Sequence, residues 1–224
     1  MRLLTLIAAS LVVASSACAK EYGTYDAKRV LTVSETPSGK KHGVDVAYLD
    51  RMVADLASHA RNYPPSFDSA ADRRRAEQDA RTLSGMLDIL VNAPNPNPEL
   101  TLRAAFVNGI GHNLDLPGAA EKASSLYQRA LAASPDDPRG NLLYGTFLAG
   151  IGKFRQSIPL LEKATAGGAL DATYALGMVY MSLGDKERAL AYLERYRAGA
   201  PDDTRVSKVI EAVRSGKVEV KASK

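Results

Sequence analysis

The stretch from residue 170 to residue 203 reads LDATYALGMVYMSLGDKERALAYLERYRAGAPDD, and it decides the fold. Within each half, the large apolar residues recur at steps of three or four, as they do on one face of a helix. Gly184 stands between the halves, where glycine can take the left-handed conformation that ends a helix. Pro201 stops the second half because it lacks a backbone donor. The stretch therefore predicts two antiparallel helices joined by a short turn.

The same pattern occurs twice more upstream. Glycines recur at 111, 145 and 177, and again at 118, 152 and 184, so that both series step by 34 and then by 32 residues. Small residues (Ala123, Ser157 and Ala189) and large apolar residues (Tyr127, Leu161 and Leu193) recur in the same phase. Glycine inside a helix costs about 1 kcal/mol relative to alanine. Its return at one register predicts that the first glycine of each unit lets the second helix approach closely.

These units resemble the tetratricopeptide repeat (TPR) family across Ala104 to Asp203. We divide the array into units at 104–137, 138–169 and 170–203. The middle unit lacks the terminal proline and has Gly167-Gly168 there instead. The resemblance implies an all-α fold, a right-handed superhelical array of antiparallel helix pairs, in which about three units are needed for a stable stack.

Helical patterns also flank the repeats. Residues 44–93 are predicted to form a helical hairpin, with Asp45 capping the first helix and Asp68 or Ser69 capping the second. Residues 204–216 read as a capping helix that covers the third unit, and residues 217–224 as a polar tail. Residues 20–43 have no helical period and are expected to form a flexible arm, with a short strand near Val30, Thr32 and Val33 as the one regular element considered.

The first 19 residues have the pattern of a bacterial export signal. Arg2 precedes a 12-residue apolar stretch, Leu3 to Ala14, which is too short for a membrane anchor of about 20 residues. Two processing routes remain open. A signal peptidase cut after Ala19 would release a soluble periplasmic protein. Alternatively, Cys18 would become the lipidated N-terminus and anchor the protein in the outer membrane as a lipoprotein. Ser15 stands where such sites usually have an aliphatic residue.

Composition argues against several functional classes. The net charge of +4 is modest, and cationic residues are scattered among acids, so no nucleic-acid partner is expected. The single cysteine leaves no disulfide or thiolate metal site, and the three histidines have no metal-ligand spacing. We therefore expect no cofactor, no metal and no enzymatic activity, and we interpret the chain as a scaffold whose partner is another protein or a peptide.

The resemblance implies that the first helix of each unit lines a concave groove that holds a peptide or a partner helix. Projecting the register onto that face gives eight candidate partner-binding residues: Asn108, His112, Arg139, Leu142, Thr146, Tyr174, Met178 and Met181. Methionine and tyrosine suit adaptable apolar contacts. The alternative for some of these residues is that the last helix covers them.

Two other functions remain as alternatives. The first is a structural lipoprotein of an envelope assembly, held by a lipid on Cys18. The second is an enzyme subunit whose site lies in the N-terminal hairpin and uses His42 or His59. The second alternative requires the fold to bring these histidines and acidic residues together, because no catalytic motif joins them in sequence.

Overall fold

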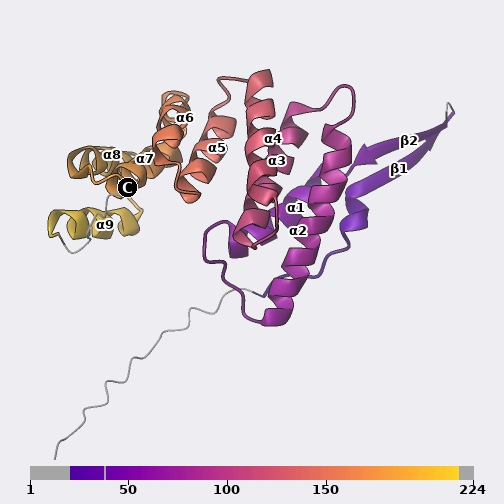
Figure 1. Cartoon of the computed structure of the whole chain (residues 1–224), viewed down its shortest axis with the longest axis horizontal. Helices are drawn as coiled ribbons and strands as arrows, with labels where there is room; N and C mark the ends of the chain where they lie inside the picture. The colour runs from indigo at the N-terminus through magenta and orange to yellow at the C-terminus, as the bar shows by residue number, and fades with distance from the viewer. Residues whose placement is uncertain (1–20, 38, 217–224) are drawn as a thin grey trace, which may run out of the picture.

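The computed structural model describes residues 21–37 and 39–216. The predicted all-α array of antiparallel helix pairs is confirmed, and a small β-hairpin precedes it (Figure 1). In chain order the elements are the 3-10 helix η1 (Ala27–Val30), strands β1 (Leu31–Thr36) and β2 (Gly39–Val44), and helices α1 (Val46–Ala60), α2 (Ala70–Val91), α3 (Pro98–Asn113), α4 (Ala119–Ala133), α5 (Pro138–Gly150), α6 (Phe154–Ala166), α7 (Leu170–Ser182), α8 (Lys186–Gly199) and α9 (Thr204–Arg214). The signal sequence, Cys18 and the polar tail lie outside the described residues.

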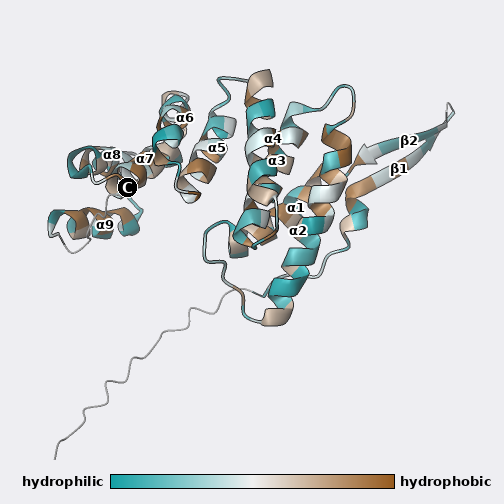
Figure 2. Cartoon of the chain, viewed as in Figure 1, coloured by the Kyte–Doolittle hydropathy of each residue, from teal (hydrophilic) through white to brown (hydrophobic). Residues whose placement is uncertain are grey.

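Helix pairs α3–α4, α5–α6 and α7–α8 pack most closely, and glycine makes two of these contacts feasible. A Cβ on Gly145 would stand 2.7 Å from Cγ of Leu161, and one on Gly177 would stand 2.8 Å from Cγ of Leu193. Real Cβ atoms do not approach other carbons that closely. At Gly111 the approach is looser, with Cδ1 of Leu116 at 3.3 Å. Helices α1, α4, α6 and α9 have an apolar side and a polar side, whereas the first helices α3, α5 and α7 carry apolar residues on more than one side (Figure 2).

Each repeat turns at a left-handed glycine, as the sequence predicts. Gly118, Gly152 and Gly184 have φ values of +72°, +78° and +82°. The aspartates that follow Pro135 and Pro201 cap the next helix: Asp137 accepts from the backbone N–H groups of α5, and Asp203 accepts from that of Arg205 in α9. Such caps offset the unpaired donors of a helix start.

The last helix, α9, closes the C-terminal end of the described array. Val206, Ile210 and Val213 are buried on one face of α9. Val206 and Ile210 pack with Leu193 and Tyr196 of α8. Because this face covers the apolar side of the third pair, the stack does not end on exposed core residues.

The N-terminal part differs from its sequence-based interpretation. The expected flexible arm is wrong for most of its length, because β1 and β2 pair in antiparallel register and residues 21–30 dock onto the helices. The expected direct pairing of α1 with α2 is also replaced: α2 packs along α3, and α1 contacts α3 and η1. The physical reason is a non-local contact that the local pattern does not reveal, namely the burial of Tyr22.

Tyr22 is fully buried between α1 and α2. Its hydroxyl donates to Asp79 of α2 at 2.9 Å, and its ring meets that of His59 in α1 edge-on at 5.7 Å. Asp55 of α1 accepts from the N–H of Gly23 and the hydroxyl of Tyr25, both at 2.9 Å. The segment before β1 is therefore part of the core, where it joins two helices that do not lie directly along each other.

Replacing Gly177 by alanine is expected to lower the free energy of unfolding by about 1–2 kcal/mol, since overpacking against Leu193 outweighs the better helix propensity of alanine. Gly85→Ala is the matched control, because Gly85 lies within α2 and no atom stands within 4 Å of the position that its Cβ would take. That change is expected to raise the free energy of unfolding by about 0.5–1 kcal/mol. Urea unfolding measures both, and a similar gain at the two positions would contradict the packing role.

Alkaline pH is expected to destabilise the protein partly through Tyr22. Burial, followed by the neighbouring Asp79 carboxylate, raises the pKa of the Tyr22 hydroxyl above its ordinary value. In the unfolded chain the Tyr22 hydroxyl ionises at about pH 10, as in a free tyrosine, whereas in the folded protein it stays neutral to higher pH. The contribution of this hydroxyl to the free energy of unfolding is therefore fully present below about pH 10 and is lost as pH rises further. Tyr22→Phe should cost about 1 kcal/mol at neutral pH and flatten the alkaline loss. Urea titrations at several pH values test this, and an unchanged alkaline slope would contradict it.

Candidate functional site

A groove of about 700 Å³ runs along the first helices of the repeat pairs. Its wall begins at residues 61–63, which follow α1, continues along α3, α5 and α7, and reaches Arg205 at the start of α9. The first helix of each pair lines it because the second helices pack on the outer side. A volume of this size lies within the range of ordinary ligand sites, which is about 300–1,000 Å³.

Aromatic rings form the middle of the groove. Phe147 of α5 packs against Tyr127 at 5.6 Å between ring centroids, and Tyr127 stacks on Tyr144 at 5.2 Å. Gly109 of α3 permits this arrangement, because a Cβ there would stand 3.3 Å from Cδ2 of Phe147. Burial raises the pKa of the Tyr127 hydroxyl above its ordinary value. Tyr127 is buried beneath the groove, so its ring forms part of the floor. The floor is therefore a packed aromatic surface.

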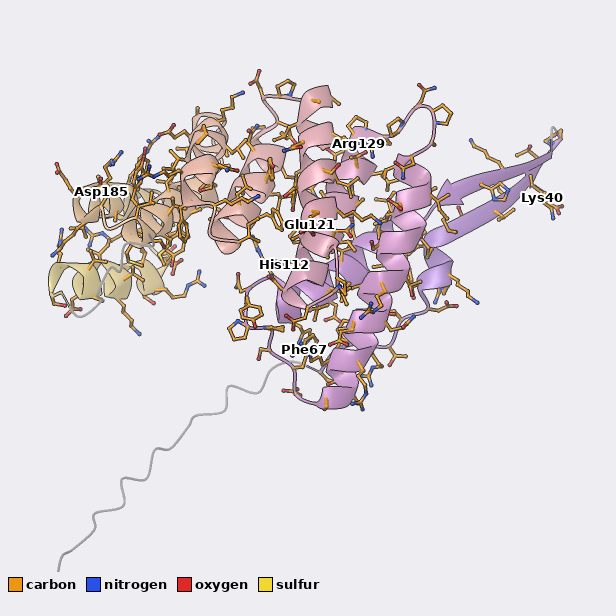
Figure 3. All side chains as sticks on the ribbon, viewed as in Figure 1. Lys40, Phe67, His112, Glu121, Arg129 and Asp185 are labelled. Carbon is orange, nitrogen blue, oxygen red and sulfur yellow. The ribbon has the colours of Figure 1, made fainter. Side chains whose placement is uncertain are left out.

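Five of the eight residues predicted from the register line the groove: His112, Leu142, Thr146, Tyr174 and Met178. The His112 ring meets Phe147 edge-on at 6.4 Å, and His112 stands near the C-terminal end of α3 (Figure 3). The Thr146 hydroxyl donates to the carbonyl oxygen of Leu142 at 2.9 Å, which leaves its methyl group as the simplest contact for a ligand. Tyr174 packs against Tyr196 at 5.2 Å.

Asn108 and Met181 do not line the groove. Asn108 is 3% exposed; Ser84 of α2 donates to its Oδ1, and its own amide donates to the Ala104 carbonyl. The register projection is wrong for Asn108 by one position, because neighbouring Gly109 is the residue that faces Phe147. Met181 instead packs with the core formed by α7 and its neighbours.

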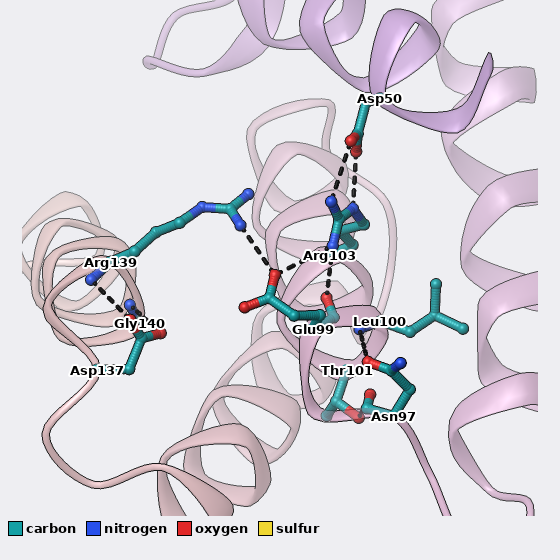
Figure 4. A network of polar contacts seen from close by, with 9 residues as sticks. All are labelled: Asp50, Asn97, Glu99, Leu100, Thr101, Arg103, Asp137, Arg139 and Gly140. Atoms are coloured by element: carbon teal, nitrogen blue, oxygen red, sulfur yellow. Dashed lines mark hydrogen bonds and ion pairs between the residues drawn. The ribbon is translucent and has the colours of Figure 1, made fainter. Parts of the chain in front are cut away.

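Arg139 also lies outside the groove, in a polar network that joins α1, α3 and α5 (Figure 4). Its Nη1 donates to Oε2 of Glu99 in α3 at 3.0 Å. Arg103 donates to the same carboxylate and, through two nitrogens, to Asp50 of α1 at 2.7 and 3.0 Å. These hydrogen bonds from Arg103 hold the pKa of the Asp50 carboxyl below its ordinary value. The network fixes α1, α3 and α5 relative to one another beside the groove.

Several groove residues are missed by the sequence projection. Phe106 and Phe147 line it, and their only signal in the sequence is that Phe147 follows the predicted Thr146 directly and Phe106 stands two residues before the predicted Asn108. Arg61 and Tyr63 come from the segment after α1, which no repeat register covers. Asn113 of α3 holds that segment, since its amide donates to the carbonyls of Ala60 and Arg61 at 3.0 and 2.9 Å.

The two ends of the groove differ in charge. Arg61 stands at the α1 end, and Asp171 stands on α7 toward the other end. At the start of α9, Arg205 donates twice to Asp203, which lowers the pKa of that carboxyl, and Asp203 also accepts from the Tyr196 hydroxyl at 3.1 Å. The Asp203–Arg205 pair is internally neutralised, so Asp171 gives this end its negative charge.

The histidines proposed for an enzyme site do not meet. His59 is buried in the last turn of α1, where its ring stacks on Phe67 at 5.0 Å and its Nδ1 lies 3.0 Å from the Ser66 carbonyl. His42 is exposed on β2, next to the opposite end of α1. A helix of this length separates its ends by roughly 20 Å. Asp55 is the acid nearest His59, at 3.9 Å, and both are part of the buried Tyr22 region.

Metal-ligand clusters and membrane-spanning helices are both absent from residues 21–37 and 39–216. Within these ranges no three histidine, cysteine or acidic side chains cluster as metal ligands do. In the same part of the chain, none of the helices combines the length and apolar character needed to cross a bilayer.

Comparison with known proteins identifies the repeat. A tetratricopeptide repeat family model matches residues 152–213. No curated protein matches the chain. Among solved structures, MamA shares 21% identity with a TM-score of 0.55, covering 66% of this chain and 85% of its own. The thermophilic TPR protein TTC0263 of Thermus thermophilus shares 16% identity with a TM-score of 0.53, covering 75% of this chain and 91% of its own.

A third structure, YrrB, is described as a TPR protein with an unusual peptide-binding site. It shares 19% identity with a TM-score of 0.50 and covers 77% of this chain and 86% of its own. Identities this low establish a common fold. A tetratricopeptide repeat is therefore identified in residues 152–213, and the glycine period and the stacked helix pairs show that the preceding pairs have the same fold.

Proposed function

We propose that this protein is a non-enzymatic scaffold that binds a peptide or a helix of another protein in the groove along α3, α5 and α7. The observation that carries the proposal is the groove itself, which is continuous over three first helices and has Phe147 at its centre. TPR proteins bind other proteins or peptides, and the fold supports the same use here.

The groove chemistry favours an apolar segment as the ligand. Tyr174 and Met178 are half-buried and line the same groove as Phe147, so they offer apolar contact area while losing little conformational entropy on binding. Aromatic side chains in partly desolvated pockets dominate many interfaces. Charged groups stand only toward the ends, where Arg61 would favour an acidic residue and Asp171 a basic one.

The groove prediction is tested by placing a photo-crosslinking amino acid at position 174 in the host cell. We expect a covalent adduct with one partner, because this side chain would touch the bound segment. The same amino acid at position 89 is the control, since Ile89 is 77% exposed on α2, away from the groove lining. The partner should then bind the Tyr174→Ala/Met178→Ala variant about 30-fold more weakly in vitro.

Thermal unfolding must accompany that binding measurement, because Tyr174 also packs on Tyr196. A folded double variant that binds its partner normally would contradict the proposed site. Equal crosslinking from positions 174 and 89 would contradict it as well, since the contact would then be non-specific.

For the location, we propose export to the periplasm as a soluble protein, with an outer-membrane lipoprotein as the alternative. The support is the apolar stretch after Arg2 and the Ala17-Cys18-Ala19 sequence that follows it. Mass spectrometry of the mature N-terminus in the native host distinguishes the two. We expect a free Lys20 start. A diacylglycerol-modified Cys18 would replace this proposal by the lipoprotein alternative, and an intact Met1 start would contradict both.

A further inference from the structure

The β-hairpin is the part of the molecule that the groove does not use. Its two six-residue strands pair from Leu31–Val44 to Thr36–Gly39. It projects from the α1–α2 end of the helix row, opposite α9, and Lys40 stands near its tip (Figures 1 and 3). None of its residues lines the groove. Five of the six residues of each strand are exposed, and Val44, at the base of β2, packs against the core, so the helical body covers the hairpin only at its base.

An uncovered pair of strands leaves backbone groups without strand partners. Within the described ranges the sheet consists of β1 and β2 alone. In an antiparallel pair, every second residue of each strand turns its N–H and C=O groups away from the other strand. Two strands without a covering layer are only marginally stable in water, and a free edge is a template for a third strand. A third strand could therefore pair with the outward-facing N–H and C=O groups of the hairpin.

Exposed apolar side chains gather at the same place. Leu31 is 46% exposed, Val33 is 57% exposed, and Val46, at the start of α1, is 42% exposed. Leu31 and Val33 are two residues apart in β1 and so lie on one face of the hairpin, with Val44 opposite Leu31. Large apolar residues that cluster in the open indicate an interaction surface rather than a scatter of single residues.

The two edges of the hairpin are not equivalent. Strand β1 is rich in β-branched residues and has Glu35 as its one charged residue, which the register places opposite Lys40. Strand β2 carries Lys40 and Lys41 together with two glycines, and lysine on an edge opposes strand pairing. The edge of β1 is therefore the one open to a partner.

The charge around the hairpin selects the kind of partner. Residues 28–44 contain four cations (Lys28, Arg29, Lys40 and Lys41) and one anion (Glu35), which gives +3, against +4 for the whole chain. Two hairpins of the same charge repel each other, which disfavours a second copy. An anionic lipid surface offers no backbone donors and acceptors for an open strand edge, and such edges do not enter hydrocarbon.

We propose that the edge of β1 binds an extended, acidic segment of another protein, which adds as a third strand and covers Leu31 and Val33 with its apolar side chains. Backbone hydrogen bonds along the edge supply affinity, and the surrounding cations supply preference for acidic sequences. This proposal is independent of the groove, since it uses different residues at one end of the molecule.

The test uses protein purified after expression of the full-length sequence and two labelled peptides of about ten residues. One peptide alternates valine with glutamate, and the other alternates valine with lysine. We expect fluorescence anisotropy to show tighter binding of the glutamate peptide by about tenfold at low salt. We expect hydrogen exchange to slow in residues 31–36 when that peptide is present.

Two variants test the charge preference and the apolar contact separately. Lys40→Glu/Lys41→Glu should reverse the preference toward the lysine peptide. Val33→Thr keeps a β-branched residue in the strand while removing apolar surface, and it should weaken binding roughly threefold. Ile89→Thr, at an exposed apolar position on α2, should change nothing.

Four results would overturn the proposal. The first is equal binding of the two peptides, and the second is slowed hydrogen exchange in α3, α5 and α7 in place of β1. The third is self-association of the protein that Lys40→Glu/Lys41→Glu strengthens. The fourth is the absence of peptide binding together with binding to anionic phosphatidylserine vesicles that Val33→Thr weakens. Because the groove variant Tyr174→Ala/Met178→Ala should leave peptide binding at the hairpin unchanged, failure here is distinguishable from failure of the scaffold function.

Discussion

The close approach of paired helices at Gly145 and Gly177 is the constraint on which the array depends. Leucines from α6 and α8 occupy the space that a side chain on these glycines would need. This contact brings each second helix onto the outer side of its pair. The first helices are then left facing one another across the concave side, and the groove follows from that arrangement. The shape of the groove therefore follows from the close packing of the helix backbones, whichever side chains line it.

The sequence predicted the repeated part well because its determinants are local. A glycine at a fixed register, a left-handed turn and an aspartate cap each act within a few residues, so all recur visibly along the chain. The groove was predicted less completely. A register projection carries an error of about one residue, which turned Asn108 into a groove residue although it faces α2, and it could not include Arg61 from outside the repeats.

The N-terminal part could not be predicted because its contacts are distant in sequence. Tyr22 contacts His59 of α1 and Asp79 of α2, which are 37 and 57 residues away, and a local sequence pattern does not reveal such burial. The strands β1 and β2 contain glycine, lysine and serine, so their alternation of apolar and polar residues is weak. The network from Asp50 through Arg103 and Glu99 to Arg139 likewise depends on how three helices meet in space. The same network keeps α1, and hence the adjoining hairpin, in a fixed relation to the groove.

The burial of Tyr22 also limits how far the body could stand from a membrane. Position 18 is four Cα-to-Cα steps from position 22, and an extended chain covers at most about 3.5 Å per step. In the lipoprotein alternative, the Cα atom that carries the lipidated side chain would therefore stand at most about 14 Å from the Cα atom of Tyr22. A body tethered in this way would stay close to the membrane surface. In the soluble alternative, a chain that starts at Lys20 would have no such tether.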